Sequence, residues 1–519
     1  MKGADLVIEV LIRAGVSVCF GYPGGAAMPL YDSLYKRKNE IRHIRSAHEQ
    51  GAAHAADGYA RASGRLGVCI ATSGPGATNL VTGIATAYAD SVPVLFITAN
   101  VASAEIGTDS FQEADIAGIT TPVCKYNWTV REPEKLVNTL KKAIFLSTSG
   151  RPGPTLVDIP TDILSFEFGK NYNIDGGELT EGREARLPES CEIKAAELER
   201  VAQLINNSSR PVLLCGGGVR ISGAFEEIKG LAEKTGSPVA TTLMAVGTLP
   251  YGHPLNFGMV GEYGAGDAAR IINAADLIIA VGVRFSNRTH NISGGEKTVI
   301  HIDNDASEIN KNIHAAAALV GDAKKIIREL LPFVSEKKPW MPSSERTSDS
   351  IFSMLSEALG KNAFVVTDVG NHQMRVANYY PFETPGSFIT SGGFGTMGFG
   401  LGAAIGCRLA REDVPAVLIT GDGSFKMNLT ELATLKENGL RLLIIVMNNA
   451  SLGMVRDMQK KKFGRRYIAT EGRKRLPDFG KIASAYGIKS AVARTEKDLR
   501  RALESYKSCG EAFLIDLRL

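Results

Sequence analysis

The sequence predicts an α/β protein with three doubly wound parallel-sheet domains. Short, continuously apolar runs alternate with helix-length amphipathic segments along the chain. Such runs are typical of parallel strands covered on both faces, and their alternation with helices favours open, doubly wound sheets. Gly accounts for 55 of the 519 residues, which suits a fold with many tight turns between strands and helices.

The predicted elements can be given in chain order. The N-terminal stretch MKGADLVIEVLIRAG reads as an amphipathic helix and not as a signal peptide, because Asp5 and Glu9 interrupt its apolar run. Residues 67–100 predict a strand, a Gly/Pro turn, a helix and a second strand. Further strands are expected within residues 210–220, 237–244, 275–285, 298–305, 363–370, 415–423, 440–449 and 512–519.

Two polar stretches, residues 168–190 and 334–350, read as linkers because they are rich in charged, Gly, Ser or Pro residues. They divide the chain into three α/β blocks. We therefore expect an N-terminal domain over residues 1–170, a central Rossmann-like domain over 190–333 and a C-terminal domain over 350–519.

Charge and cysteine content exclude several classes of protein. The 59 basic and 55 acidic residues are interspersed and give a net charge of +4, which argues against a nucleic-acid or membrane-surface protein. No apolar run approaches the length of a membrane span. The seven cysteines are scattered and form no CxxC pair, which favours free buried thiols in a reducing compartment. We therefore expect a cytoplasmic protein.

The stretch GDGSFKMNLTELATLKENGLRLLIIVMNN carries the most specific chemical signal. Asp422 follows one predicted strand and Asn449 follows the next, with a helix between them. Because ligands gather at the carboxyl ends of parallel strands, the two oxygen-bearing side chains should lie side by side. Glycines and a helix N-terminus favour phosphate there, and Mg²⁺ is often completed by phosphate oxygens. Alone, GDG would be read as an ordinary turn, but the joint pattern predicts a site for a metal–diphosphate pair.

This pattern, in which Asn449 follows Asp422 by 27 positions, resembles the metal–diphosphate motif of thiamine-diphosphate (ThDP) enzymes. NNASLGMV, residues 448–455, narrows the resemblance to the catalytic subunit of acetohydroxyacid (acetolactate) synthases. Other stretches agree across nearly the whole chain, namely FGYPGGAAMPLYDSL, AHEQGAAHAADGYARASGRLGVCIATSGPGATNL, IGTDSFQEADIAGIT, SGRPGPTLVDIPTDI, VGNHQM and GGFGTMGFGLGAAIG.

The resemblance implies a decarboxylating carboligase, a transferase that joins two 2-oxo acids. Pyruvate would add to the C2 ylid of ThDP and lose CO₂. The resulting hydroxyethyl-ThDP enamine would add to a second pyruvate, giving 2-acetolactate, or to 2-oxobutyrate. Two alternatives remain open: a related ThDP lyase or acyl transferase with another acceptor, and a flavin-using pyruvate oxidase. A non-enzymatic binding module is disfavoured, because Glu49, Met397, Asp422 and Asn449 coincide.

The resemblance also assigns roles in cofactor binding. Glu49 would be the catalytic carboxyl beside N1′ of the aminopyrimidine, and His48 would be structural. Met397 would be the apolar wedge that bends ThDP, and Gly395 would bind the pyrimidine through its backbone. The diphosphate-side residues would be Gly370, Asn371, His372, Gly421, Asp422, Gly423, Ser424, Asn449 and Met454. Mg²⁺ would be held by Asp422, Asn449 and the backbone carbonyl of Ser451.

Near the reacting carbon the resemblance points to Gly25, Phe111, Gln112 and Lys125. Phe111 and Gln112 read otherwise as loop residues, and Lys125 as a solvated lysine. A cation at Lys125 would steer the carboxylate of an oxo acid.

The central block carries the pattern with which this family binds FAD. Gly-rich strand ends can cradle a diphosphate, and Asp303 can bind a hydroxyl group of the dinucleotide. The implied residues are Gly216, Gly217, Gly218, Thr242, Leu243, Met244, Arg284, Asp303 and Asp322. An empty Rossmann-like domain is the alternative, and Glu262 and Tyr263 depart from the family's usual Met-His in this region.

Other departures concern the acceptor and the assembly. Met458 stands where the family has a Trp linked to 2-oxobutyrate preference, and Arg375 where an aromatic is common. The chain stops at Leu519, where the family normally continues. The resemblance further implies a homodimer or homotetramer with Glu49 and Asp422 of one site on different chains, and a regulatory small subunit.

Overall fold

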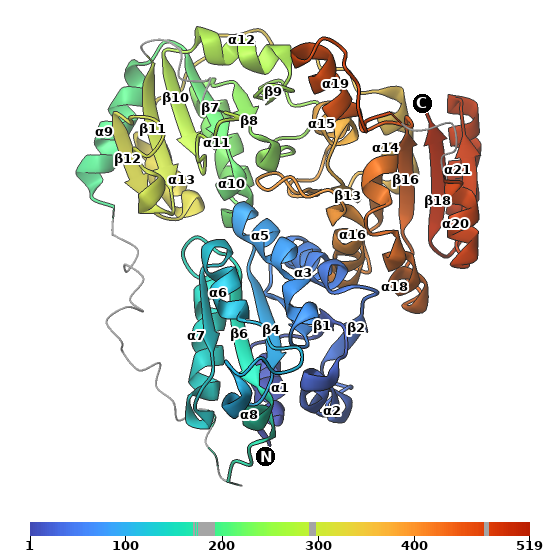
Figure 1. Cartoon of the computed structure of the whole chain (residues 1–519). Coiled ribbons are helices and arrows are strands. Elements are labelled where there is room, and N and C mark those ends of the chain that lie inside the picture. The colour runs from blue at the N-terminus through green and yellow to red at the C-terminus, as the bar shows by residue number, and fades with distance from the viewer. Residues whose placement is uncertain (170–171, 173, 175–192, 290–296, 472–476) are drawn as a thin grey trace. The chain divides into compact units, whose positions relative to one another are not determined.

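The computed structural model describes residues 1–169, 172, 174, 193–289, 297–471 and 477–519. It contains three parallel six-stranded sheets, each flanked by helices (Figure 1), which confirms the predicted fold class. The chain divides into two compact units. The first comprises residues 1–187, 364–372 and 389–519, and the second comprises residues 188–363 and 373–388.

The first sheet has the strand order β2-β1-β3-β4-β6-β5. Its strands are β1 (Val18–Gly21), β2 (Arg42–Arg45), β3 (Gly67–Ala71), β4 (Val94–Asn100), β5 (Tyr126–Thr129) and β6 (Thr155–Pro160). The accompanying helices are α1 (Gly3–Arg13), α2 (Met28–Lys36), α3 (Glu49–Ser63), α4 (Pro75–Thr78), α5 (Val81–Asp90), α6 (Ile116–Thr120), α7 (Leu136–Thr148) and α8 (Thr161–Ser165). The order reverses direction between β1 and β3, which makes the ends of these two strands a topological switch point, where doubly wound folds bind ligands.

The second sheet has the order β12-β11-β10-β7-β8-β9 and its switch point between β7 and β10. Its strands are β7 (Pro211–Cys215), β8 (Val239–Thr241), β9 (Asn256–Met259), β10 (Leu277–Val281), β11 (Thr298–Asp303) and β12 (Ala317–Val320). The helices in this part of the chain are α9 (Ala195–Asn207), α10 (Gly217–Ser222), α11 (Phe225–Thr235), α12 (Gly266–Ala274) and α13 (Ala323–Leu330).

The third sheet has the order β14-β13-β15-β16-β18-β17. Its strands are β13 (Phe364–Thr367), β14 (Phe388–Ile389), β15 (Ala416–Gly421), β16 (Leu443–Asn448), β17 (Lys489–Ala493) and β18 (Phe513–Arg518). The helices in this part of the chain are α14 (Ser350–Leu359), α15 (Asn371–Tyr379), α16 (Phe399–Ala410), α17 (Asp422–Phe425), α18 (Leu432–Glu437), α19 (Gly453–Lys462), α20 (Phe479–Ala485) and α21 (Glu496–Lys507).

The sequence predictions can now be compared with these elements. Every strand predicted from an apolar run is present, and so is the N-terminal helix. The helix expected between Asp422 and Asn449 is divided into α17, a 3-10 turn over Leu429–Glu431 and α18. The predicted linker at 334–350 contains neither helix nor strand before α14 begins at Ser350, whereas most of the linker at 168–190 lies outside the described residues. The exact domain boundaries stay predictions.

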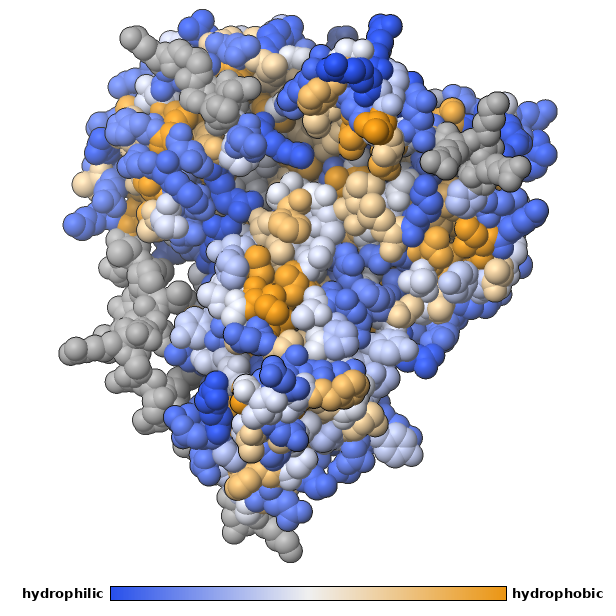
Figure 2. Space-filling model, viewed as in Figure 1, coloured by the Kyte–Doolittle hydropathy of each residue, from blue (hydrophilic) through white to orange (hydrophobic). Residues whose placement is uncertain are grey.

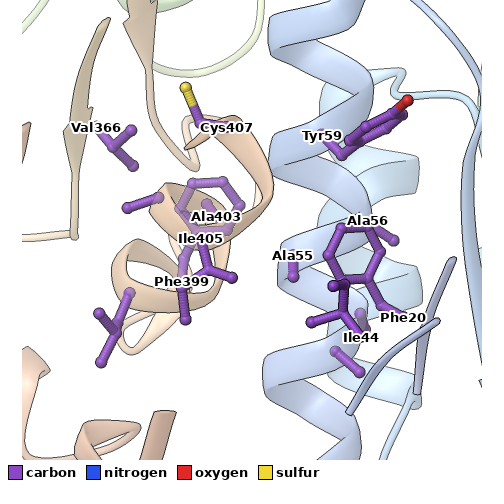
Figure 3. Close-up of a cluster of buried hydrophobic side chains, with 14 of the residues drawn as sticks. Phe20, Ile44, Ala55, Ala56, Tyr59, Val366, Phe399, Ala403, Ile405 and Cys407 are labelled. Carbon is purple, nitrogen blue, oxygen red and sulfur yellow. The ribbon is translucent and has the colours of Figure 1, made fainter. Parts of the chain in front are cut away.

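Helices α3 and α16 pack against each other at unusually short range because both present small residues. A Cβ added at Gly406 would lie 1.8 Å from the carbonyl oxygen of Ala55, and one added at Gly58 would lie 2.1 Å from that of Ala403. Figure 3 shows the two helices side by side, with Phe399 and Ala403 on α16 and Ala55 and Tyr59 on α3 within one buried cluster. The first and third sheets therefore share a continuous apolar core.

The described cysteines, helices and surface can be compared with the sequence predictions, while the cytoplasmic location stays a prediction. Six cysteines lie among the described residues, and all six are free and buried; Cys191 lies outside the described residues. Among the residues with described positions, no helix combines the length and apolar character that a membrane span needs. Figure 2 shows a face covered mainly by hydrophilic residues, with hydrophobic side chains gathered in small patches.

Candidate functional site

Glu49 is the first residue of α3 and lies near the switch point of the first sheet. Its side chain is 9 % exposed, and its Oε2 accepts a hydrogen bond of 3.0 Å from Nδ2 of Asn79. A Cβ added at Gly76 would lie 3.3 Å from the Glu49 carboxylate. The structure thus brings Glu49 against the turn that follows β3, so a buried carboxylate faces the ligand-binding edge of this sheet.

Gly25 and Gln112 lie at the same edge. Gly25 is exposed and has open space where a side chain would be. A Cβ at Gly74 would lie 2.7 Å from the carbonyl oxygen of Gln112, so the backbone of Gln112 packs directly on the turn after β3. Gln112 has a left-handed φ of 61°, a strained conformation that is frequent at functional sites. Phe111 beside it is 87 % exposed.

Lys125 lies in a different environment from the one its predicted role requires. Its ammonium donates hydrogen bonds to the carbonyl oxygens of Leu146, Ser149 and Arg151, the latter two at 2.9 and 2.8 Å. These carbonyls surround the C-terminal end of α7, where a cation is favourable. In this structure Lys125 stabilises a helix end, and its role in steering a substrate carboxylate stays a prediction.

The unit that opens with Asp422 adopts the predicted geometry. Strands β15 and β16 are parallel neighbours, with Gly421 opposite Met447. The backbone N–H of Asn449 donates to the Asp422 carboxylate, which lowers its pKa, but burial outweighs this and raises the pKa above its ordinary value. Asp422 and Asn449 therefore meet at the carboxyl edge of the third sheet.

The turn after Asn449 has a strained backbone that is held by a side-chain hydrogen bond. Ala450 has a left-handed φ of 56°, and the Oδ1 of Asn449 accepts the N–H of Ser451 at 3.0 Å. Within the described parts of the chain, no cluster of three or more His, Cys, Asp or Glu side chains could hold a metal ion. A metal at this edge would thus depend on one carboxylate together with amide, carbonyl and phosphate oxygens, a set that suits Mg²⁺ and not Zn²⁺.

Residues for a diphosphate converge on the same edge. Ser424 Oγ donates to the carbonyl oxygen of Val369 at 2.9 Å. Cβ atoms added at Gly421 and Gly370 would lie about 3.0 Å from the His372 ring. A Cβ at Gly453 would lie 2.9 Å from Nδ2 of Asn371, which places Asn371 beside the first turn of α19, where Met454 is the second residue. The absence of side chains at these glycines lets His372 and Asn371 pack directly against the backbone of this edge.

His372 tests whether this edge fits a phosphate group. Burial lowers the pKa of His372 to about 4, so its ring is neutral at pH 7. Its Nε2 is buried and has no hydrogen-bond partner among the described residues. The ring also donates a hydrogen bond to the backbone of Asp368, so the neutral ring keeps its single proton on Nδ1 and its Nε2 is an acceptor. A buried polar atom without a partner is costly, and a phosphate group next to Nε2 would satisfy it by raising the pKa, so that the ring becomes protonated and donates from both nitrogens. The residues therefore fit an anionic ligand of the predicted kind.

The loop that carries Gly395 and Met397 precedes α16. Gly395 has a left-handed φ of 71° and open space around it, which leaves its backbone accessible. Met397 points toward the edge that carries Asp422, because its Cε lies 3.7 Å from a Cβ added at Gly423. The buried carboxylate of Asp368, whose pKa burial raises to about 6, accepts the N–H of Gly398 at 2.8 Å and of Gly400 at 3.2 Å. Asp368 thus ties this loop to the end of β13.

The same loop is also held by a buried charge network on α3 and α5. Arg61 donates to Asp57, to Asp90 at 3.0 Å and to the carbonyl oxygen of Thr390 at 2.9 Å, and all three charged side chains are 0 % exposed. Asp90 accepts the N–H groups of Gly392 and Gly393 at 3.1 and 2.6 Å. The sequence reasoning missed this network, because its hydrogen-bonded members are separated by up to 329 positions.

The central sheet brings most of the predicted FAD residues to its switch point. A Cβ at Gly216 would lie 2.0 Å from the carbonyl oxygen of Gly282, and one at Gly217 would lie 3.3 Å from Cβ of Met244. Gly218 donates to Gly282 at 3.2 Å, and Thr242, which precedes Leu243, donates to Cys215 at 2.8 Å. Close packing against Gly282 and Met244 therefore explains these glycines, and both segments lie at the carboxyl ends of the neighbouring strands β7 and β8, the position where doubly wound folds bind dinucleotides.

The remaining predicted FAD residues lie on β10–β12 or next to these strands. Asp303 ends β11, and its pKa is raised by burial. The carboxylate of Asp322 accepts the N–H of Lys325 at 3.0 Å and thereby caps α13, which explains this aspartate without any ligand. The backbone carbonyl of Arg284 accepts from Asn312. The surroundings of Asp303 and Arg284 neither support nor contradict FAD binding. The capping role of Asp322 gives no support for it.

The departures from the family pattern have local explanations. Arg375 donates to Asp349 at 2.6 Å and lies over the ring of Phe352. The carbonyl oxygen of Tyr263 accepts from Asn378 at 2.8 Å, and Glu262 beside it is exposed. Met458 lies on α19 and is 43 % exposed.

Comparison with known proteins first identifies the enzyme class to which the domains of this chain belong. Residues 1–119 match the N-terminal TPP binding domain of thiamine pyrophosphate enzymes, residues 198–330 the central domain and residues 368–517 the C-terminal TPP binding domain. The chain is 41% identical to a protein of Methanocaldococcus jannaschii named probable acetolactate synthase large subunit, over 100% of this chain and 92% of that protein.

Two further similar proteins are also acetolactate synthases. The acetolactate synthase of Arthrospira platensis is 39% identical over 100% of this chain and 94% of its own length, and that of Mycobacterium bovis is 41% identical over 96% and 85%. The chain belongs to the acetolactate synthase large-subunit family of thiamine pyrophosphate enzymes.

Proposed function

We propose that this chain binds ThDP with Mg²⁺ and joins two 2-oxo acids, converting two pyruvates into 2-acetolactate and CO₂. The single observation that carries the proposal is the meeting of Asp422 and Asn449 at one sheet edge beside the partnerless Nε2 of His372. It is supported by the family of the chain. When bound, ThDP supplies the carbon nucleophile and the electron sink that decarboxylation needs.

The metal and the diphosphate would share one set of residues. Asp422, Asn449 and the carbonyl of Ser451 would ligate Mg²⁺, and the strained backbone at Ala450 supports a turn built to present such oxygens. With the diphosphate bound, His372 would become protonated and donate from Nε2 to a phosphate oxygen, and the backbones at Gly421 and Gly423 would approach the same group. Removal of the metal should therefore also release the cofactor.

Glu49 and the loop before α16 would act at the aminopyrimidine. Glu49 would hold or transfer the proton at N1′, a role supported by its burial and by the hydrogen bond that fixes its Oε2. Gly395 and Met397 would bind the ring through backbone groups, with the Met397 side chain as an apolar support. Proton transfer by such a positioned carboxyl typically contributes about two to four orders of magnitude in rate.

The substrate would enter beside Gly25, Phe111 and Gln112. Open space at Gly25 and the exposed ring of Phe111 support this placement. Lys125 would have to leave its carbonyl partners to bind a substrate carboxylate directly. While it keeps them, it can act only through its charge.

We further propose that the central domain binds FAD at Gly216–Gly218 and Thr242–Met244, supported by the position of both segments at the carboxyl ends of the neighbouring strands β7 and β8. Some relatives, among them the protein of Methanocaldococcus jannaschii, are named large subunits, and this supports a regulatory small subunit as a partner. The proposal includes a homodimer or homotetramer in the cytoplasm. Flavin absorbance of the purified protein, or its appearance after reconstitution, tests the FAD assignment.

The central test is the Glu49→Gln variant, which keeps the shape of the side chain and removes its acid. We expect ThDP binding within a few-fold of the unmodified protein, and a loss of C2-proton exchange of about two to four decades. Exchange is measured as replacement of the C2 proton by deuterium in bound ThDP. Products from pyruvate alone, and from pyruvate with 2-oxobutyrate, are identified in parallel. Near-normal exchange in Glu49→Gln would exclude Glu49 from proton transfer, and CO₂ release without acetolactate would refute the acceptor assignment.

A further inference from the structure

A second buried glutamate lies beneath the start of α3. Glu431 is the last residue of the 3-10 turn Leu429–Glu431, which precedes α18, and it is 1 % exposed. Its Oε1 accepts the backbone N–H of His48 at 3.0 Å, and its Oε2 accepts that of Ala47 at 3.2 Å. The Thr434 hydroxyl donates to the same Oε2 at 2.6 Å. One carboxylate of the C-terminal part of the chain thus binds the two residues immediately before Glu49.

The close approach of Glu431 requires a glycine on α3. A Cβ added at Gly51 would lie 2.0 Å from Oε1 of Glu431 and 2.4 Å from its carboxyl carbon. Any side chain at position 51 would therefore displace the carboxylate from the N–H groups that it accepts. Gly51 has no such side chain, so the glutamate can reach the backbone of the segment that precedes the helix.

The segment around Glu49 is consequently fixed at three points. Glu431 holds the backbone N–H groups of Ala47 and His48. The ring of His48, at its Nδ1, accepts the N–H of Gln50 at 3.2 Å and so caps α3. Asn79 holds the Glu49 carboxylate itself. Of these three contacts, only that of Glu431 comes from outside the N-terminal sheet and its helices, across more than 380 positions of sequence.

We infer that Glu431 is a positioning residue for Glu49: it fixes the backbone just before α3, so that the Glu49 carboxyl is held where it serves the aminopyrimidine. This inference rests on the proposed function, because it assumes that Glu49 transfers a proton to ThDP. A displacement of about 1 Å at such a group can cost on the order of 100-fold in rate. Glu431 itself touches neither substrate nor cofactor in this account.

The Glu431→Gln variant tests the inference with minimal change of volume. An amide has only one oxygen, so its NH₂ group would face one of the two N–H donors, lose that hydrogen bond and repel the donor. We expect the variant in the ThDP- and Mg²⁺-loaded enzyme to lose about 10- to 100-fold in C2-proton exchange. The dissociation constant of ThDP should change less than about threefold, because the diphosphate residues lie elsewhere.

Asp158→Asn is the matched control. Asp158 is a carboxylate that is 1 % exposed, and it accepts from Thr98 and Asn100 on the first sheet, both at 2.7 Å. Its substitution removes a buried charge of the same kind without touching residues 47–51, so exchange should stay within about twofold of the unmodified enzyme. An equal loss of exchange in this control would overturn the inference, because any buried carboxylate would then have the same effect.

Two less disruptive variants test the same inference if Glu431→Gln does not fold. Thr434→Val removes the hydroxyl that holds Oε2 of Glu431, and Thr434→Ser retains it. We expect exchange to fall about 2- to 10-fold in Thr434→Val and to return to within twofold of normal in Thr434→Ser. Unchanged exchange in Thr434→Val, or no recovery in Thr434→Ser, would overturn the inference.

The outcomes separate this inference from the function on which it rests. Exchange in the unmodified enzyme no faster than in free ThDP would refute the proposed function and the inference together. Normal exchange in the unmodified enzyme with unchanged exchange in Glu431→Gln would overturn the inference alone. Parallel losses of exchange and ThDP affinity in Glu431→Gln would also overturn it, since a purely structural role predicts that result.

Discussion

The contact between α3 and α16 makes a quantitative prediction for Gly406→Ala. The added methyl group would lie 1.8 Å from the carbonyl oxygen of Ala55, whereas ordinary contacts of a Cβ begin at 3.4 Å. The two helices must therefore separate by about 1.6 Å. A gap of even 0.5–1 Å forfeits roughly a quarter to a half of each dispersion contact, and overpacking of a core typically costs about 1–3 kcal/mol.

We expect a cost at the upper end of that range, about 3 kcal/mol, because the neighbour is backbone and cannot rotate away. For domains of 150–250 residues, each kcal/mol lowers the melting temperature by about 2–4 °C, so the melting temperature should fall by about 6–12 °C. The assay is thermal unfolding followed by circular dichroism, with carboligase activity measured on the same samples. Activity should fall as well, because α3 begins with Glu49 and α16 follows Met397.

Gly230→Ala is the control for this substitution. Gly230 lies inside α11, and nothing stands within 4 Å of its added Cβ. The same change should therefore stabilise that helix by about 0.5–1 kcal/mol, the usual difference between Gly and Ala in a helix interior. A Gly406→Ala protein that melts within about 1 °C of the unmodified protein would refute the reasoning about this helix contact.

Four further predictions follow from the site and the core. Asp422→Ala should weaken Mg²⁺ and ThDP together, because the proposed function gives them one shared site; wild-type ThDP affinity of this variant in the presence of a chelator would contradict the metal bridge. If Glu49 and Asp422 of one site come from different chains, mixing Glu49→Gln with Asp422→Ala should restore some activity through hybrid dimers, and no recovery after verified subunit exchange would indicate a site within one chain. Met458→Trp should raise the ratio of acetohydroxybutyrate to acetolactate, measured with both oxo acids present, by a factor that corresponds to about 1–3 kcal/mol. If the unmodified protein already strongly favours acetohydroxybutyrate, another residue selects the acceptor. Burial lowers the pKa of His54 to about 3, so the unfolded chain takes up a proton below pH 6.5 that the folded chain does not. Stability should then fall by about 2–3 kcal/mol between pH 6.5 and 4.5, and the His54→Gln variant should lose less over the same range in denaturant titrations; equal losses would place the sensitivity in other groups.

The interior strands of the fold could be predicted from the sequence, and several edge strands could not. β15 and β16 are buried along almost their whole length and appear as continuous apolar runs. β2 and β17 lie at sheet edges and are largely exposed or half-buried. Without a covered face they carry no apolar run, so only pairing with a neighbouring strand reveals them.

The candidate site divides in a similar way. Asp422 and Asn449 could be paired in advance, because one βαβ crossover joins them and fixes their adjacency. Glu431 and Asp90 could not, since they bind backbone groups more than 300 positions away, and no local pattern encodes such a contact. For Lys125, the resemblance predicted more than the structure supports. The resemblance implies that Lys125 steers a substrate carboxylate, whereas in the structure its ammonium donates to three backbone carbonyl groups.

The small-residue face of α3 has a consequence for the synthesis of the chain. α16 begins 336 positions after α3 ends, and ribosomes add about 5–20 residues per second. The alanines and glycines of α3 that α16 covers therefore stay open to water for roughly 20–70 s after they leave the ribosome. The first sheet is already complete by then, so the nascent protein presents a nearly finished domain with one uncovered helix, which is the kind of surface that chaperones recognise.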